Sequence, residues 1–161
     1  MINVGQKAPD FKLLDKDKNE VSLDNFKGKN LIIFFYPMAG TGACTKEMCS
    51  VQDDFKMYEG MNASVVGIST DTLFALKWFS EQNKITYPLL SDFNKQTIND
   101  YDVVLPEFAF GYKNVAKRCT FILDKDGIVR FIEILANAGD QPNMVAIKEA
   151  LQKITNQAVN Q

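Results

Sequence analysis

Residues 31–49 read Leu-Ile-Ile-Phe-Phe-Tyr-Pro-Met-Ala-Gly-Thr-Gly-Ala-Cys-Thr-Lys-Glu-Met-Cys, and their pattern is the main indication of the fold. The apolar run Leu31–Tyr36 stops at Pro37, which is typical of a strand buried on both faces. From about Ala43 to Tyr58 the apolar residues instead recur with helical spacing. The stretch therefore predicts a buried strand, a short loop and a helix.

The rest of the chain continues this alternation. In chain order it predicts short extended pieces and turns up to Gly28, a strand at 64–69, helices at 72–83 and 96–101, and a hairpin of strands 120–123 and 128–133. A last helix is predicted after Asp140, with Asp140 as its cap and Pro142 in its first turn. Its buried stripe is Met144, Ile147, Leu151 and Ile154.

This order of elements indicates the fold class. Strand, helix, strand, helix requires a parallel βαβ unit, and the hairpin adds antiparallel strands. We therefore expect an α/β protein with a thioredoxin-like fold: a mixed central β-sheet flanked by helices, with an N-terminal β extension. The 161 residues suit one domain, residues 1–161, because a chain of this length buries roughly two thirds of its unfolded surface.

The composition excludes several kinds of chemistry. The chain has no His and three Cys. Without His there is no Ser-His-Asp triad, no Cys-His dyad and no His-ligated haem or zinc, and three Cys are too few for a tetrathiolate zinc site. We therefore expect no metal and no cofactor, and a reaction that depends on thiols, carboxylates, cations or hydroxyls.

Charge and hydropathy disfavour some partners, and the cysteine count points to a reducing compartment, with the cytoplasm as the expected location. The net charge is −2 without a basic block, which disfavours nucleic acid and anionic membranes as partners. No run reaches the roughly 18 apolar residues of a membrane span. The first residues, Met1–Gly5, lack the basic and apolar regions of a secretory signal. An odd, small number of Cys is typical of a reducing environment.

Cys44 is the candidate nucleophile. It falls where the helix begins, just beyond the carboxyl end of the strand 31–36, and open α/β sheets place their sites at such junctions. Free N–H groups and the helix dipole stabilise an anion at a helix start. A thiolate can therefore form here without a His as base.

Five motifs in order resemble the peroxiredoxin family (AhpC/TSA superfamily). The central one is Pro37-x-x-x-Thr41-x-x-Cys44. The others are Val4-Gly5-x-x-Ala8-Pro9-Asp10-Phe11, Phe26-x-Gly28-Lys29, Tyr87-Pro88-Leu89-Leu90-Ser91-Asp92, and Arg118-x-Thr120-Phe121 leading into Asp124-x-Asp126-Gly127. Residues 44–49 are similar to the bacterioferritin-comigratory-protein (peroxiredoxin Q) branch, and the chain also resembles the one-Cys alkyl hydroperoxide reductase E type.

The resemblance implies a role for each residue of the central motif. Cys44 is the peroxidatic Cys, which attacks a hydroperoxide and becomes a sulfenic acid. Thr41 offers its hydroxyl to the thiolate and the peroxide oxygen, and Pro37 shields the sulfur from water. Arg118 supplies a cation beside the thiolate and holds the peroxide. Glu47, three residues after Cys44, is expected to orient Arg118.

Cys49 is the expected resolving Cys, on a geometric condition. Residues five apart on an ideal helix have Cα atoms roughly 8.5–9 Å apart, whereas a disulfide needs less than about 7 Å. Cys44 and Cys49 can therefore bond only if the first turns of the helix unwind. Three alternatives stay open: a one-Cys enzyme resolved by an external thiol, a non-enzymatic peroxide sensor, and a thiol–disulfide oxidoreductase. The last commonly uses Cys-x-x-Cys rather than the Cys-x4-Cys found here.

Cys119 is expected to be a packed, inert thiol. Side chains alternate along a strand, so Cys119 faces away from the site if its neighbour Arg118 faces it. The expected partners are the hydroperoxide and thioredoxin or a similar dithiol, and the sequence is compatible with a monomer or a homodimer. No Cys lies in the C-terminal tail to form a bridge between subunits.

Overall fold

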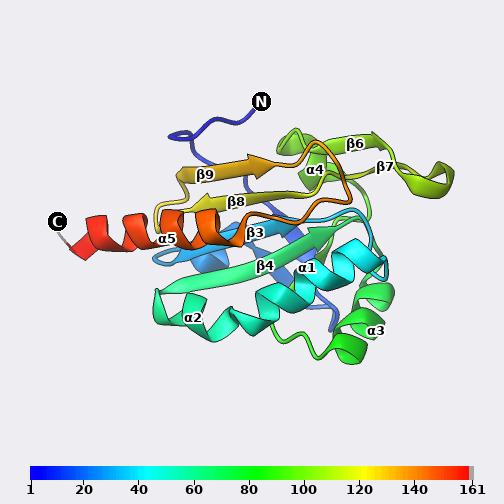
Figure 1. Cartoon of the computed structure of the whole chain (residues 1–161), viewed down its shortest axis with the longest axis horizontal. Helices are drawn as coiled ribbons and strands as arrows, with labels where there is room; N and C mark the ends of the chain where they lie inside the picture. Colours follow the sequence, from blue (N-terminus) through cyan, green and yellow to red (C-terminus); the bar gives the residue numbers. More distant parts are fainter. Residues whose placement is uncertain (160–161) are drawn as a thin grey trace.

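The computed structural model describes residues 1–159, with side chains as far as Gln157, and is built on a seven-stranded mixed sheet (Figure 1). Asn160 and Gln161, the last residues of the expected domain, lie outside the described residues. The strand order is β2-β1-β5-β4-β3-β8-β9. These strands are β1 Lys12–Leu14, β2 Glu20–Ser22, β3 Asn30–Phe35, β4 Ala63–Ser69, β5 Leu89–Ser91, β8 Cys119–Leu123 and β9 Val129–Ile134.

Five α-helices and a small separate hairpin complete the described elements. The helices are α1 Gly42–Asp53, α2 Phe55–Gly60, α3 Leu73–Asn83, α4 Gln96–Asp100 and α5 Met144–Val159. The hairpin pairs β6 Val104–Glu107 with β7 Lys113–Ala116, and 3-10 turns lie at Leu23–Phe26 and Ala109–Gly111.

The centre of the sheet confirms the predicted mixed topology. β3 runs parallel to β4 and antiparallel to β8, and β4 runs parallel to β5. Every residue of β3 is buried, as its continuous apolar run predicts. The N-terminal β extension is β1 and β2, which join the sheet through a contact of β1 with β5.

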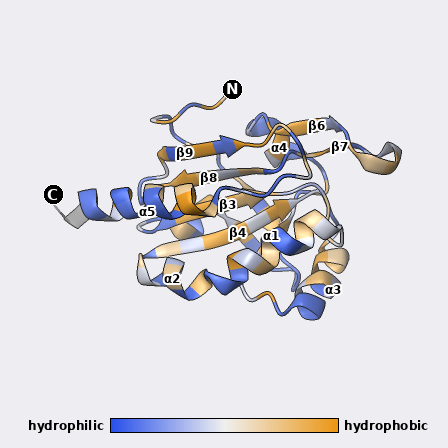
Figure 2. Cartoon of the chain, viewed as in Figure 1, coloured by the Kyte–Doolittle hydropathy of each residue, from blue (hydrophilic) through white to orange (hydrophobic). Residues whose placement is uncertain are grey.

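Two apolar layers hold the helices on the sheet, and the central strands are mostly hydrophobic in Figure 2. One layer contains buried residues of α1, α2, α3 and α5, among them Met48, Tyr58, Phe79 and Leu151. The opposite layer contains Ile98 of α4 together with N-terminal residues. The helix that carries Cys44 is therefore fixed to the same sheet face as α5.

Two details of the predicted helices are wrong. The helix expected over 43–58 is two helices that meet at Asp54, and the break redirects the chain so that Tyr58 is fully buried against the sheet. The last helix begins at Met144, not after Asp140. Asn143 is its cap, since Asn143 Oδ1 accepts a hydrogen bond from Ala146 N at 3.0 Å. Asp140 instead lies in a turn, where its N–H donates to Asn137 O. Pro142 precedes the helix instead of lying in its first turn.

Candidate active site

Cys44 lies in the first turn of α1, at the junction that the sequence indicates. The helix is capped by Thr41, whose side-chain oxygen accepts from Cys44 N at 3.4 Å. Thr45 Oγ donates back to Thr41 O at 2.7 Å and tightens the same turn. Cys44 is fully buried, so the thiol lies below the protein surface at a helix start.

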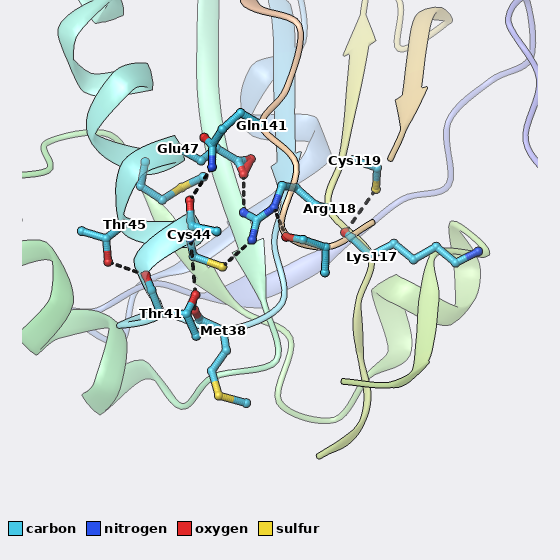
Figure 3. A network of polar contacts seen from close by, with 12 residues as sticks. Met38, Thr41, Cys44, Thr45, Glu47, Lys117, Arg118, Cys119 and Gln141 are labelled. Carbon is cyan, nitrogen blue, oxygen red and sulfur yellow. Dashed lines mark hydrogen bonds and ion pairs between the residues drawn. The ribbon is translucent and has the colours of Figure 1, made fainter. Parts of the chain in front are cut away.

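Arg118 reaches the Cys44 sulfur from the start of β8 (Figure 3). Its Nη2 lies 3.1 Å from Cys44 Sγ, and its Nη1 donates to Glu47 Oε2 at 2.8 Å. Its Nε donates to Ala138 O at 2.8 Å, so the three guanidinium nitrogens have three different partners. Burial acts to lower the pKa of Arg118, but the neighbouring Cys44 and Glu47 charges outweigh it and raise that pKa. The guanidinium is thus a fixed, buried cation beside the thiol.

Glu47 is a buried carboxylate one helical turn after Cys44. Burial raises its pKa to about 7, although the positive charge of Arg118 and the hydrogen bond from Arg118 oppose the shift. Its Oε1 has no hydrogen-bond partner, so the Arg118 contact is made through Oε2 alone. An acid in this state carries charge only near and above neutral pH.

Pro37 and Thr41 lie in the loop between β3 and α1. Pro37 is buried and lies two residues beyond the end of β3. Thr41 Oγ1 donates to Met38 O at 3.1 Å and accepts from Cys44 N, so its proton is used within the loop. The loop therefore surrounds the helix start, with the hydroxyl bonded to backbone atoms.

Neither Cys49 nor Cys119 forms a disulfide with Cys44. All three thiols are free, and α1 is intact through both Cys44 and Cys49. Cys49 is partly exposed, with its sulfur 3.9 Å from Asn83 Oδ1. Cys119 is buried, its sulfur lies 3.5 Å from Lys117 O, and burial raises its pKa well above the ordinary value. Cys119 is thus held in its thiol form away from the site.

Two contacts at the site were not predicted from the sequence. Ala138 holds Arg118 through a backbone carbonyl, which every residue possesses, so no side-chain pattern marks it. Asp71 Oδ2 accepts from Ala39 N at 2.8 Å and from Ser69 Oγ at 2.7 Å, which ties the loop 37–41 to the end of β4. The Ser69-x-Asp71 spacing directly after a buried strand is a signal that could have found it.

The described residues contain no group of three or more acidic, Cys or His side chains placed to hold a metal ion. Among the same residues, no helix has both the length and the apolar character needed to cross a membrane.

Comparison with known families gives a match over most of the chain. Residues 4–132 match the model of the AhpC/TSA family. The chain is 37% identical over 131 residues to chloroplastic peroxiredoxin Q of Suaeda salsa, covering 81% of this chain and 59% of that protein. It is 37% identical over 130 residues to the putative peroxiredoxin bcp of Coxiella burnetii, covering 80% of this chain and 85% of that protein.

Two further relatives cover nearly the whole chain. A mitochondrial thioredoxin-dependent peroxide reductase of Drosophila melanogaster is 35% identical over 163 residues, which cover 95% of this chain and 66% of that protein. The crystal structure of peroxidoxin BcpB from Mycobacterium tuberculosis superimposes with a TM-score of 0.81 at 31% identity, covering 99% of both chains. The chain spans about three fifths of the length of the plant peroxiredoxin Q proteins that it matches.

Proposed function

The chain belongs to the AhpC/TSA family, and from this premise we propose that it is a thiol-dependent peroxidase that reduces hydrogen peroxide and organic hydroperoxides at Cys44. The observation that carries the proposal is the 3.1 Å contact between Arg118 Nη2 and Cys44 Sγ inside a buried site. A cation fixed there stabilises the negative charge that moves onto the peroxide oxygens.

In the first step, the Cys44 thiolate attacks one peroxide oxygen. A sulfur–oxygen bond forms and the oxygen–oxygen bond breaks. The sulfur is oxidised to a sulfenic acid, and the leaving oxygen takes up a proton to become water or an alcohol. Arg118 is the catalytic cation of this step, because its Nη2 already points at the reacting sulfur.

Three residues position this pair in the proposed mechanism. Glu47 orients Arg118 through the 2.8 Å ion pair. Thr41 caps the helix start, and its hydroxyl becomes available to thiolate and peroxide if it turns from Met38 O. Pro37 is buried after β3 and keeps water from the sulfur.

In the second step, Cys49 resolves the sulfenic acid. Cys44–SOH and Cys49–SH form a disulfide and release water, which needs the first turns of α1 to unwind because both residues lie in that helix. Thioredoxin or a similar dithiol then reduces the disulfide and is itself oxidised. The name of the Drosophila relative supports this class of reductant. Three free thiols fit a reducing compartment such as the cytoplasm.

The alternative second step uses an external thiol instead of Cys49. The intact helix favours it, because Cys44 and Cys49 sit on different turns. In that case the sulfenic acid forms a mixed disulfide with a small thiol or a protein thiol, and Cys49 remains reduced.

Peptide mass spectrometry after one equivalent of peroxide tests the proposal, with free thiols blocked during quenching. We expect a Cys44–Cys49 linkage in the wild type and a lone oxidised Cys44 in Cys49→Ser. The matched control is Cys119→Ser, which should consume peroxide at the wild-type rate. Oxidation confined to Cys119, or peroxide consumption that survives Cys44→Ser, would falsify the assignment. A lone oxidised Cys44 in the wild type supports the external thiol.

A further inference from the structure

The segment between β9 and α5, residues 135–143, lies against both Arg118 and the start of α1, and is called the strap below. Leu135 N donates to Arg118 O at 3.0 Å, and Ala138 O accepts from Arg118 Nε at 2.8 Å. Further along, Gln141 Nε2 donates to Ala43 O at 3.0 Å (Figure 3). The strap thus makes two separate connections, one with the catalytic cation and one with the helix backbone.

The Gln141 contact is on the part of α1 that the second step has to open. Ala43 is the residue directly before Cys44, in the first turn of the helix. Another side chain, Tyr87, holds the backbone of this region at Met48 O, 2.8 Å away. That contact is buried and lies beside Cys49, so it can persist while the turn around Cys44 unwinds. The Gln141 bond lies before Cys44, where unwinding moves the chain.

We propose that Gln141 is a latch: its bond to Ala43 O holds the first turn of α1 closed, and breaking this bond is part of the opening that brings Cys44–SOH to Cys49–SH. The proposal rests on the Cys49 route described above, in which the two groups form a disulfide and water. Among the hydrogen bonds of the described residues, Gln141 has none with the Cys44 sulfur or the Arg118 guanidinium. It is therefore a positioning residue for the second step only.

The latch differs from the Arg118 connection of the same strap. Ala138 supports the cation that acts on peroxide, and a backbone carbonyl cannot be removed by substitution. Gln141 is partly exposed and contributes a side-chain amide, so it can be changed while the strap backbone stays in place. The two steps of the reaction are thus separable by mutation on this side of the site.

The test compares Gln141→Ala with Gln52→Ala. Gln52 is the matched control because it lies on the same helix and bonds a distant residue, Thr86, at 2.9 and 2.8 Å, but beyond Cys49. After one equivalent of hydrogen peroxide, acid quench and thiol alkylation give the rate of Cys44–Cys49 disulfide formation. We expect this rate to rise about 2- to 12-fold in Gln141→Ala, the equivalent of one hydrogen bond of about 0.5–1.5 kcal/mol. Gln52→Ala should match the wild type.

Gln141→Glu strengthens the comparison, because a carboxylate cannot donate to Ala43 O and repels it. The rate of Cys44–Cys49 disulfide formation should rise at least as much in Gln141→Glu as in Gln141→Ala. The rate of consuming the first peroxide equivalent should stay at the wild-type value in both variants. Equal disulfide rates in wild type and Gln141→Ala, or the same acceleration in Gln52→Ala, overturn the latch.

Hydrogen exchange separates failure of the latch from failure of the Cys49 route. Amides 43–49 of the reduced protein should exchange about 2- to 12-fold faster in Gln141→Ala, in line with the loss of one hydrogen bond. If the wild type forms no Cys44–Cys49 disulfide but exchange rises as expected, the Cys49 route and the resolving role of the latch fail, while the holding of the first turn of α1 by Gln141 is confirmed. If exchange is unchanged, the latch fails whatever the chemistry.

Discussion

Arg118 Nη2 lies 3.1 Å from Cys44 Sγ although 74 positions separate the two residues in the chain. The same guanidinium bonds Glu47 and Ala138, each at 2.8 Å. β8 pairs with β3 in the sheet, and β3 leads into the loop before α1, so the sheet brings the start of β8 to the start of that helix. One side chain thereby connects Cys44, Glu47 and the strap.

Arg118→Lys should lower the second-order rate of reaction with hydrogen peroxide by about 10²–10³-fold, the range for removing one aligned stabilising donor. A single ammonium cannot replace the planar fork that reaches Cys44, Glu47 and Ala138 together. Stopped-flow competition for peroxide measures the rate. Lys117→Ala is the control, since it removes a positive charge from the adjacent position without touching Cys44. A comparable loss in Lys117→Ala would indicate a general effect of net charge instead.

Glu47 should make the stability of the wild type depend on pH in a predictable direction. Burial raises its pKa from 4.5 to about 7, so the folded state binds an extra proton between these values. This stabilisation is complete below the unfolded value of 4.5 and is lost as the pH rises through about 7. The free energy of unfolding of the wild type relative to Glu47→Gln should therefore fall by on the order of 2 kcal/mol from about pH 5 to about pH 8.

Urea denaturation at several pH values measures this difference, and subtracting the Glu47→Gln curve removes the contribution of other titrating groups. Asp124 titrates in the opposite sense: burial raises its pKa, but hydrogen bonds from Arg130 and the Ile128 and Asp126 amides outweigh burial and lower it. A flat difference between wild type and Glu47→Gln over the whole range would contradict a buried, partly neutral Glu47.

Asp71→Ala should reduce the rate with peroxide about 2- to 12-fold, because the loop 37–41 loses the acceptor for Ala39 N. Asp71→Asn keeps one oxygen that can accept from Ala39 N and Ser69 Oγ, so it should restore most of the rate. The rate is measured as for Arg118. If Asp71→Asn is as slow as Asp71→Ala, negative charge and not loop geometry is what matters at this position.

Gly67→Ala should destabilise the fold by about 1–3 kcal/mol through overpacking. A Cβ at Gly67 would lie 2.7 Å from Leu89 Cδ2 and 3.3 Å from Tyr36 Cε1, so the Leu89 side chain would have to move and the Tyr36 ring would have to give way by a few tenths of an ångström. Gly60→Ala is the matched control, because nothing lies within 4 Å of its Cβ position. Urea denaturation should show a loss of stability in Gly67→Ala alone.

Much of the fold was predictable because its signals are local. The apolar run of β3 and the helical spacing of α1 lie within neighbouring residues, and they indicate a strand–loop–helix unit without knowledge of the rest. β5, β6 and β7 were not predicted as strands, because each has only three or four residues and too few positions to show a period. The break at Asp54 does not interrupt the apolar spacing, so the spacing could not reveal it. The cap at Asn143 was missed although its contact with Ala146 N spans only three residues.

Local sequence pattern is enough to predict the unit that holds Cys44: a buried strand, a loop and a helix start, whose backbone amides favour an anion for reasons of local geometry. The motif around Arg118 indicated a partner for that thiol through family resemblance. The packing of distant segments is what divides the three guanidinium nitrogens among Cys44, Glu47 and a carbonyl of the strap. It also decided that Gln141 bonds the helix start. Both follow from strand pairing and loop packing between distant segments, which no spacing along the chain records.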